Sequence, residues 1–185
     1  MKLQALLSLV IICLFALNMQ AQPMEELSIG SEMPYPDYEM VGTDGQMYSL
    51  ASTKSENGTL VIFSCNTCPY VIAWQDRYNP LAALSEELGV GMIVVNPNEA
   101  YRDGDDSPEA MKAHAEKHNY QFPYVIDTDH HLADAMGATR TPHVYLFDAE
   151  DKLVYVGAID DNYKDASKVE QHYLENALRA LAAGE

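Results

Sequence analysis

Short, nearly uninterrupted apolar runs recur along the chain, and longer segments with helical spacing of apolar residues lie between them. The runs at residues 59–64 and 91–96 are typical of strands that are buried on both faces of a sheet. Three further short runs predict strands at residues 123–127, 141–148 and 153–159. The polar turn at residues 148–152 predicts that the last two strands pair as a hairpin.

Four helical segments are predicted between and after these strands, at residues 69–88, 107–119, 130–136 and 168–183. Gly89 ends the first of them, and Asn79-Pro80 inside it predicts a kink or a restart, because proline lacks a backbone N–H. Ser107 before a proline is a typical start for the second. Strands that alternate with helices, followed by a final hairpin and helix, predict an α/β fold with a mixed central sheet covered on both faces.

The region before the first strand predicts a smaller element. Residues 38–50 contain the Asp44-Gly45 pair between short apolar alternations, which is the signal of a β-hairpin. Residues 23–38 include three prolines and have little periodicity. We therefore expect an extended lead-in followed by an N-terminal β-hairpin extension.

The start of the chain has the pattern of a secretory signal peptide. Lys2 provides a positive charge, residues 6–17 a short apolar stretch, and Ala21 a small residue at a cleavage position. An uncleaved membrane anchor is the alternative, but the stretch is shorter than the ~20 apolar residues that a spanning helix needs. We expect a signal peptide at residues 1–21, one domain at residues 22–185, and export to the periplasm or outside the cell, with no membrane insertion after cleavage.

The charge balance narrows the range of partners. The chain has 185 residues, 28 of them acidic and 11 basic, which gives a formal net charge of −17. Such a surface repels nucleic acid and anionic membranes, so neither is an expected partner. Because 48% of the residues are hydrophobic, the chain has enough apolar side chains to form the core of a single domain.

Two of the three cysteines carry the clearest chemical signal. Cys13 lies in the expected signal peptide, which leaves Cys65 and Cys68 in the run Val61-Ile-Phe-Ser-Cys-Asn-Thr-Cys-Pro-Tyr70. A disulfide that closes so short a loop adds little stability, and no further cysteine completes a zinc site. The favoured interpretation is a redox-active dithiol whose disulfide forms and breaks reversibly.

The expected junction between strand and helix suggests a separate role for each thiol. Backbone N–H groups and the dipole at a helix N-terminus stabilise a thiolate and lower its pKa. We expect Cys65 to occupy this position and to act as the nucleophile. Cys68, one turn further along, is expected to be more buried and to act as the resolving thiol.

A predicted strand ends in Cys-x-x-Cys and is followed by a helix, a strand, a helix and a Thr141-Pro142 pair that opens a hairpin strand. This order of elements resembles the thioredoxin-like fold. The N-terminal hairpin and the segments Asn96-Pro-Asn-Glu99 and Ser107-Pro-Glu-Ala-Met-Lys112 resemble the redoxin (AhpC/TSA-like) branch. Within that branch the chain is similar to exported thioredoxin-family proteins that carry Cys-Asn-x-Cys-Pro. The resemblance covers residues 27–183.

The resemblance implies a thiol–disulfide oxidoreductase that uses no cofactor and acts on disulfides of exported proteins. In an exported compartment such an enzyme is expected to depend on a membrane-linked thiol electron donor. The resemblance also implies that Pro142 is cis and faces the dithiol, with the backbone of Thr141 pairing with an extended substrate segment. Catalysis would then belong to Cys65 and Cys68, and substrate binding to Thr141 and Pro142.

The chain departs from the thioredoxin pattern at several positions. Thioredoxins carry Trp-Cys-Gly-Pro-Cys, whereas Ser64 precedes the motif here and Asn66-Thr67 lie inside it, so the direction of exchange is left open. Thioredoxins also place a buried acid where this chain has Thr59. Glu99 is the candidate replacement for handling the proton of the resolving thiol.

Other interpretations stay open beside the oxidoreductase. A thiol peroxidase could use the same dithiol, although peroxiredoxins have a Thr and an Arg where this chain has Cys65 and Pro142. A copper-binding metallochaperone would need a histidine beside the thiolates, and His143 is placed for this, although a half-exposed strand residue is the simpler interpretation. A fold used only for binding is a further alternative.

Two smaller signals have structural interpretations that we favour. The acidic run at residues 103–107 lacks the loop pattern of a calcium site, so a solvated turn is expected there. Tyr70 and Trp74 follow the cysteines one turn apart and are expected to belong to the helix core rather than to a substrate-facing patch.

Overall fold

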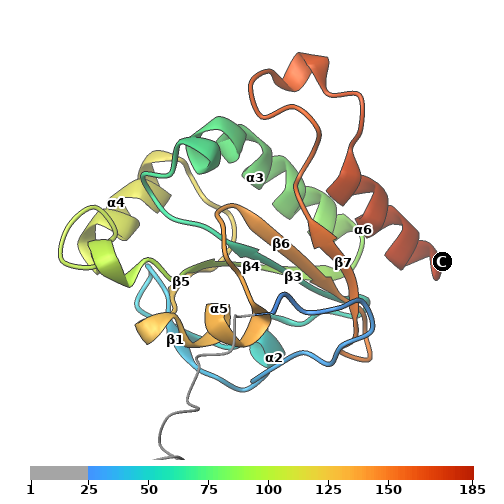
Figure 1. Cartoon of the computed structure of the whole chain (residues 1–185), viewed down its shortest axis with the longest axis horizontal. Helices are drawn as coiled ribbons and strands as arrows, with labels where there is room; N and C mark the ends of the chain where they lie inside the picture. Colours follow the sequence, from blue (N-terminus) through green and yellow to red (C-terminus); the bar gives the residue numbers. More distant parts are fainter. Residues whose placement is uncertain (1–24) are drawn as a thin grey trace, which may run out of the picture.

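The computed structural model describes residues 25–185, and the expected signal peptide at residues 1–21 lies outside them. Its centre is a mixed five-stranded sheet with the strand order β5-β4-β3-β6-β7 (Figure 1). The strands are β3 (Gly58–Phe63), β4 (Val90–Asn96), β5 (Tyr124–Ile126), β6 (His143–Phe147) and β7 (Leu153–Gly157). The pairs β3–β4 and β4–β5 are parallel, whereas β3–β6 and β6–β7 are antiparallel. The predicted mixed α/β architecture is therefore confirmed.

Helices cover both faces of this sheet (Figure 1). One face packs against α3 (Pro69–Glu87), α4 (Pro108–Lys117) and α6 (Tyr173–Ala183), and the other against α2 (Leu50–Thr53) and α5 (His131–Met136). Alternate residues of β3 explain this division, because Leu60 and Ile62 face α3 while Val61 and Phe63 face the opposite side. The central strand is thus apolar on both faces, as its uninterrupted run predicts.

The N-terminal hairpin is also confirmed. The strands β1 (Met40–Val41) and β2 (Met47–Tyr48) pair antiparallel, and a bridge from Gly42 to Val125 places the hairpin beside β5. The short helix α2 that follows was not expected from the sequence. It begins at a reciprocal cap, in which the side chains of Ser49 and Ser52 each accept a bond from the other's backbone N–H.

Two helix predictions need correction. Helix α3 continues through Pro80 without a restart, and Pro80 lies on the exposed face of the helix, where a backbone carbonyl that lacks its N–H partner costs least. Helix α6 begins at Tyr173, not at residue 168, because residues 166–168 form a separate 3₁₀ turn. Residues 158–172 form a long loop that stands out from the body between β7 and α6 (Figure 1).

Short 3₁₀ turns also occur at η2 (Glu99–Tyr101), η3 (Thr128–His130) and η4 (Ala166–Lys168). Among the helices of residues 25–185, none combines the length and the apolar character needed to span a membrane.

Candidate active site

The two cysteines lie where β3 passes into α3, but their environments are the reverse of those expected. Cys68 is the N-cap of α3, and Pro69 is its first residue. Cys65 precedes the helix by a short loop and is buried, with 6% of its surface exposed, whereas Cys68 is half-buried. The expectation that Cys65 sits at the helix N-terminus and Cys68 is the more buried thiol is therefore wrong. Proline favours the first helical position, so Pro69 places the helix start at Cys68.

Thr141 contacts both sulfur atoms. The Cys68 thiol donates to the Thr141 carbonyl oxygen at 3.2 Å, and the Cys65 Sγ lies 3.6 Å from the Thr141 hydroxyl. The Thr141-Pro142 peptide bond is cis. The cis bond implied by the family resemblance is confirmed, and the structure brings Cys65, Cys68 and Thr141 together at one place.

The two thiols have different acidities. Burial raises the pKa of Cys65 above the usual thiol value, and its hydrogen bonds to Thr141 and to the Cys68 backbone only partly offset this. Partial burial also opposes the Cys68 thiolate, but hydrogen bonds from the Thr141 side chain and from the backbone N–H groups of Val71 and Tyr70 outweigh it and lower the pKa of Cys68. The thiolate is therefore favoured on Cys68. Both cysteines are free thiols in this structure.

The loop between the cysteines is held by a buried carboxylate that the sequence did not indicate. The Asn66 N–H donates to Asp106 Oδ1 at 2.8 Å, and Asp106 is fully buried. Asn66 also donates from its side chain to the Asp105 carbonyl and accepts from the Tyr124 hydroxyl. The expected solvated turn at residues 103–107 is thus wrong at Asp106, whose side chain faces inward.

Glu99, the residue suggested for proton handling, has another role. Its carboxylate pairs with the Arg102 guanidinium at 3.4 Å. The contacts found within residues 25–185 do not join Glu99 to either cysteine. The carboxylate that hydrogen-bonds to the motif loop is the one on Asp106.

A cavity of about 460 Å³ opens beside the dithiol. Both cysteines, Thr141 and the side chains of Tyr101 and Arg140 are among its lining residues. Arg140 also reaches the Glu26 carboxylate at 3.2 Å, with about half of its side chain exposed. Both thiols and one cationic residue, Arg140, therefore border the same opening.

His143 does not join the two thiols. Its ring is fully buried, lies 2.7 Å from the Glu26 carboxylate and contacts the Tyr145 hydroxyl, on the sheet face opposite α3. Burial lowers the pKa of His143 to about 4. The expectation of a half-exposed strand residue is wrong, because the N-terminal segment that carries Glu26 covers the ring. Among residues 25–185, no group of three or more His, Cys, Asp or Glu side chains is arranged to hold a metal ion.

An aromatic cluster lies at the start of α3. Tyr70 is 53% exposed and packs edge-on against Tyr163, with ring centroids 5.2 Å apart, and Trp74 also packs edge-on against Tyr163, at 5.8 Å. Trp74 is half-buried against the core, as expected, but Tyr70 is not a core residue. Tyr163 belongs to the 158–172 loop, which sequence reasoning did not connect to this site.

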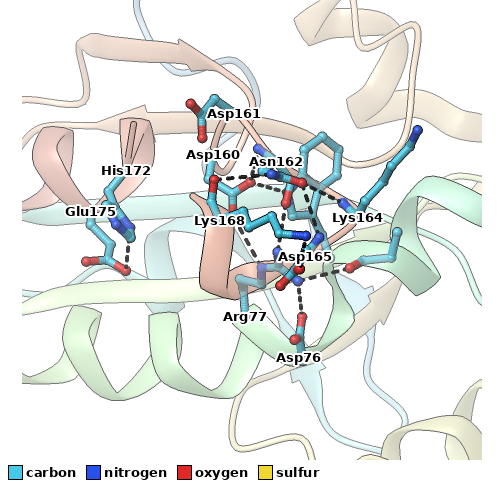
Figure 2. Close-up of polar contacts among 12 residues, drawn as sticks. Asp76, Arg77, Asp160, Asp161, Asn162, Lys164, Asp165, Lys168, His172 and Glu175 are labelled. Carbon is cyan, nitrogen blue, oxygen red and sulfur yellow. Dashed lines mark hydrogen bonds and ion pairs between the residues drawn. The ribbon is translucent and has the colours of Figure 1, made fainter. Parts of the chain in front are cut away.

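Polar contacts to α3 hold the 158–172 loop in place (Figure 2). The Arg77 guanidinium donates to the Asp160 carboxylate at 3.2 Å and to the Asn162 carbonyl at 2.8 Å. Asp160 also accepts from the indole N–H of Trp74 at 2.7 Å. A smaller cavity of about 190 Å³ lies between this loop, α3 and α6, away from the thiols. The loop is thereby fixed with Tyr163 beside Tyr70.

Comparisons with known proteins agree with this architecture. A family model described as Redoxin matches residues 29–173. An uncharacterized conserved protein from Geobacillus kaustophilus is 34% identical with a TM-score of 0.79, over 85% of this chain and 84% of that one. A protein from Sinorhizobium meliloti 1021 is 28% identical with a TM-score of 0.78, over 87% of both chains.

A more distant structure has the same fold. A protein described as thiol:disulfide interchange protein DsbE, from Chlorobium tepidum, is 18% identical with a TM-score of 0.66, over 85% of this chain and 99% of that one. At this identity the likeness concerns the fold alone. No curated protein matches the chain significantly.

Proposed function

The chain belongs to the Redoxin family and has a thioredoxin-like fold, and from these premises we propose that it is a thiol–disulfide oxidoreductase whose redox centre is the Cys65–Cys68 pair. Family and fold support a redox enzyme in general. The observation that carries the specific proposal is the pair of free thiols on an open cavity, with Cys68 at a helix start and the cis Thr141-Pro142 bond against it.

In the proposed reaction, the Cys68 thiolate attacks a disulfide of the substrate. The substrate S–S bond breaks, one substrate sulfur leaves as a thiolate, and the other forms a mixed disulfide with Cys68. The Cys65 thiol then loses its proton and attacks the Cys68 sulfur, which releases the second substrate thiolate and forms the Cys65–Cys68 disulfide. Two electrons pass to the substrate, so a dithiol donor must reduce the pair again.

This order differs from the one expected from the sequence, in which Cys65 attacks and Cys68 resolves. Burial of Cys65 hinders the approach of a protein disulfide, and a resolving thiol needs no such access. The helix-start position of Cys68 favours the thiolate that makes the first attack. Both residues keep a catalytic role in the proposal.

Substrate binding is assigned to Thr141 and Pro142. Thr141 lines the cavity and its carbonyl faces Cys68, so a substrate segment that pairs with its backbone would bring a disulfide close to that sulfur. We extend the proposal to disulfides of exported proteins, since residues 1–21 have the pattern of a signal peptide. A domain at residues 22–185 and a membrane-linked thiol electron donor follow as parts of the same proposal.

Trapping of mixed disulfides tests the reaction and its order. A Cys65→Ser variant should accumulate partners linked through Cys68, because no resolving thiol remains, whereas Cys68→Ser should trap far fewer. The wild type should reduce insulin with dithiothreitol as donor, and the double variant Cys65→Ser/Cys68→Ser serves as the matched control. Equal insulin turnover by wild type and double variant would refute the oxidoreductase proposal, while stronger trapping through Cys65 would reverse the order of attack.

Thiol peroxidase activity is a second candidate, favoured by Cys68 at a helix start beside a second thiol and by Arg140 at the cavity rim. The Cys68 thiolate would attack the peroxide O–O bond, releasing water or an alcohol and forming a sulfenic acid. Cys65 would then condense with it, releasing water and closing the disulfide. Hydrogen peroxide consumption with dithiothreitol measures this reaction, and it should be lost in Cys68→Ser and slowed in Arg140→Gln.

A further inference from the structure

The buried carboxylate of Asp106 lies behind the loop that joins the two cysteines. Its Oδ1 accepts from the Asn66 N–H and from the Asn96 side-chain amide, both at 2.8 Å, and its Oδ2 accepts from the Asn98 amide at 2.6 Å. All three donors are neutral. Within residues 25–185, Asp106 takes part in no ion pair. Both oxygens of this fully buried carboxylate therefore act as acceptors in the contacts of the described residues, which is the hydrogen-bonding role of an ionised carboxylate.

The charged and titratable groups that face Asp106 are few. Arg102 donates to the backbone carbonyl of Asp106 at 2.7 Å, so it fixes the turn without pairing with the carboxylate. Burial raises the pKa of Tyr124 well above its usual value and lowers the pKa of His114 to about 4, so both are neutral at pH 7. Cys65, one residue before Asn66, is the remaining group that Asp106 influences.

We propose that Asp106 is a positioning residue that sets the order in which the two thiols react, a role that rests on the proposed dithiol reaction. Its bond to the Asn66 N–H fixes the loop directly after Cys65. Its negative charge opposes a second negative charge on the Cys65 sulfur, so the charge of the dithiol resides on Cys68 at the helix start. The raised pKa of Cys65, caused first by burial and reinforced by Asp106, agrees with this division.

The test measures the reactivity of each thiol by itself. Iodoacetamide alkylation is followed against pH in the Cys68→Ser background, which reports Cys65, and in the Cys65→Ser background, which reports Cys68. Asp106→Asn keeps the shape of the side chain and removes its charge, so the pKa of Cys65 should fall and its alkylation at pH 7 should speed up roughly tenfold, with a smaller change for Cys68. Asp105→Asn, the same change at an exposed neighbour, is the matched control and should leave both rates unchanged.

Removing a positive charge instead of a negative one distinguishes an electrostatic effect on the alkylation rate from an effect of loosening the loop. Arg102→Gln removes a positive charge from the same turn, so it should slow Cys65 alkylation several-fold, whereas a loosened loop would expose and speed both thiols. If Asp106→Asn lowers Cys65 reactivity, leaves it unchanged or speeds both thiols equally, the proposal is wrong. If Asp106→Asn does not fold, Arg102→Gln decides, and any result other than slower Cys65 alkylation overturns it.

The alkylation rates test the role of Asp106 separately from the oxidoreductase activity. They report the charge on each thiol whether or not the protein reduces insulin. Failure of insulin turnover with the expected alkylation pattern would refute the oxidoreductase and leave the role of Asp106 in thiol acidity intact.

Discussion

Replacement of Arg77 by Gln should loosen the 158–172 loop and destabilise the whole domain. The change removes the ion pair with Asp160, whose side chain is 4% exposed, and the hydrogen bond to the Asn162 carbonyl. A net hydrogen bond to a charged group contributes about 1.5–3 kcal/mol, and breaking a buried pair costs about 3–5 kcal/mol. Because Trp74 and the Asn162 N–H still donate to Asp160, we expect a loss of about 2 kcal/mol in unfolding free energy.

Urea unfolding followed by circular dichroism measures this loss. For a domain of this size a loss of about 2 kcal/mol corresponds to a fall in Tm of about 6 °C. The matched control is Asp76→Asn, which removes the other ionic partner of Arg77. The Asp76 side chain is 64% exposed, so its loss should cost less than about 0.5 kcal/mol. If the two variants lose the same small amount of stability, the Asp160 contact does not anchor the loop.

Three further predictions concern substrate, pH and backbone. Tyr70→Ser should raise KM for insulin several-fold and leave the reduction of a small aromatic disulfide unchanged, if this exposed ring contacts protein substrates. Burial lowers the pKa of His143 from 6.5 to about 4 in the folded state, so the unfolded chain binds the proton more readily. The contribution of His143 to stability should be full above pH 6.5 and fall by about 3 kcal/mol towards pH 4, and His143→Gln should flatten this slope in urea titrations. Gly58→Ala should cost more than about 3 kcal/mol, because φ is +137° and a Cβ would meet the Phe147 carbonyl, whereas Gly45→Ala, with open space around it, should cost about 1 kcal/mol.

The sheet and its order of elements could be predicted because a strand that is buried on both faces appears in the sequence as an uninterrupted run of apolar residues. Residues 59–64 and 91–96 read as central strands since nearly every side chain in them packs against a helix layer. The late start of α6 could not be predicted in this way. Residues 168–172 have no strong helix-breaking residue, and the loop before Tyr173 is held by contacts to α3 that depend on the completed fold.

The grouping of Cys65, Cys68 and Thr141 in the candidate site could be predicted, but not which of the two thiols is the more buried. The spacing of Cys65 and Cys68 is visible in the sequence, and Pro69 carried a signal for the true helix start, since proline is favoured at the first position of a helix. Burial of Asp106 left no such signal. Asp103, Asp105 and Asp106 are equivalent by type and spacing, and the inward direction of Asp106 is fixed by Asn66, forty residues away.

Thiol chemistry and substrate recognition should be separable, because different segments hold the two sides of the dithiol. Asp106 supports the loop after Cys65, whereas Tyr70, in the first turn of α3, packs against Tyr163 of the 158–172 loop. Within residues 25–185, the two side chains share no hydrogen-bond or aromatic partner. Expressed as RT ln(kcat/KM) for insulin, the effects of Asp106→Asn and Tyr70→Ser should therefore add in the double variant to within about 0.5 kcal/mol. A larger deviation would mean that substrate bound at Tyr70 itself shifts the acidity of the thiols, so that recognition and attack are coupled.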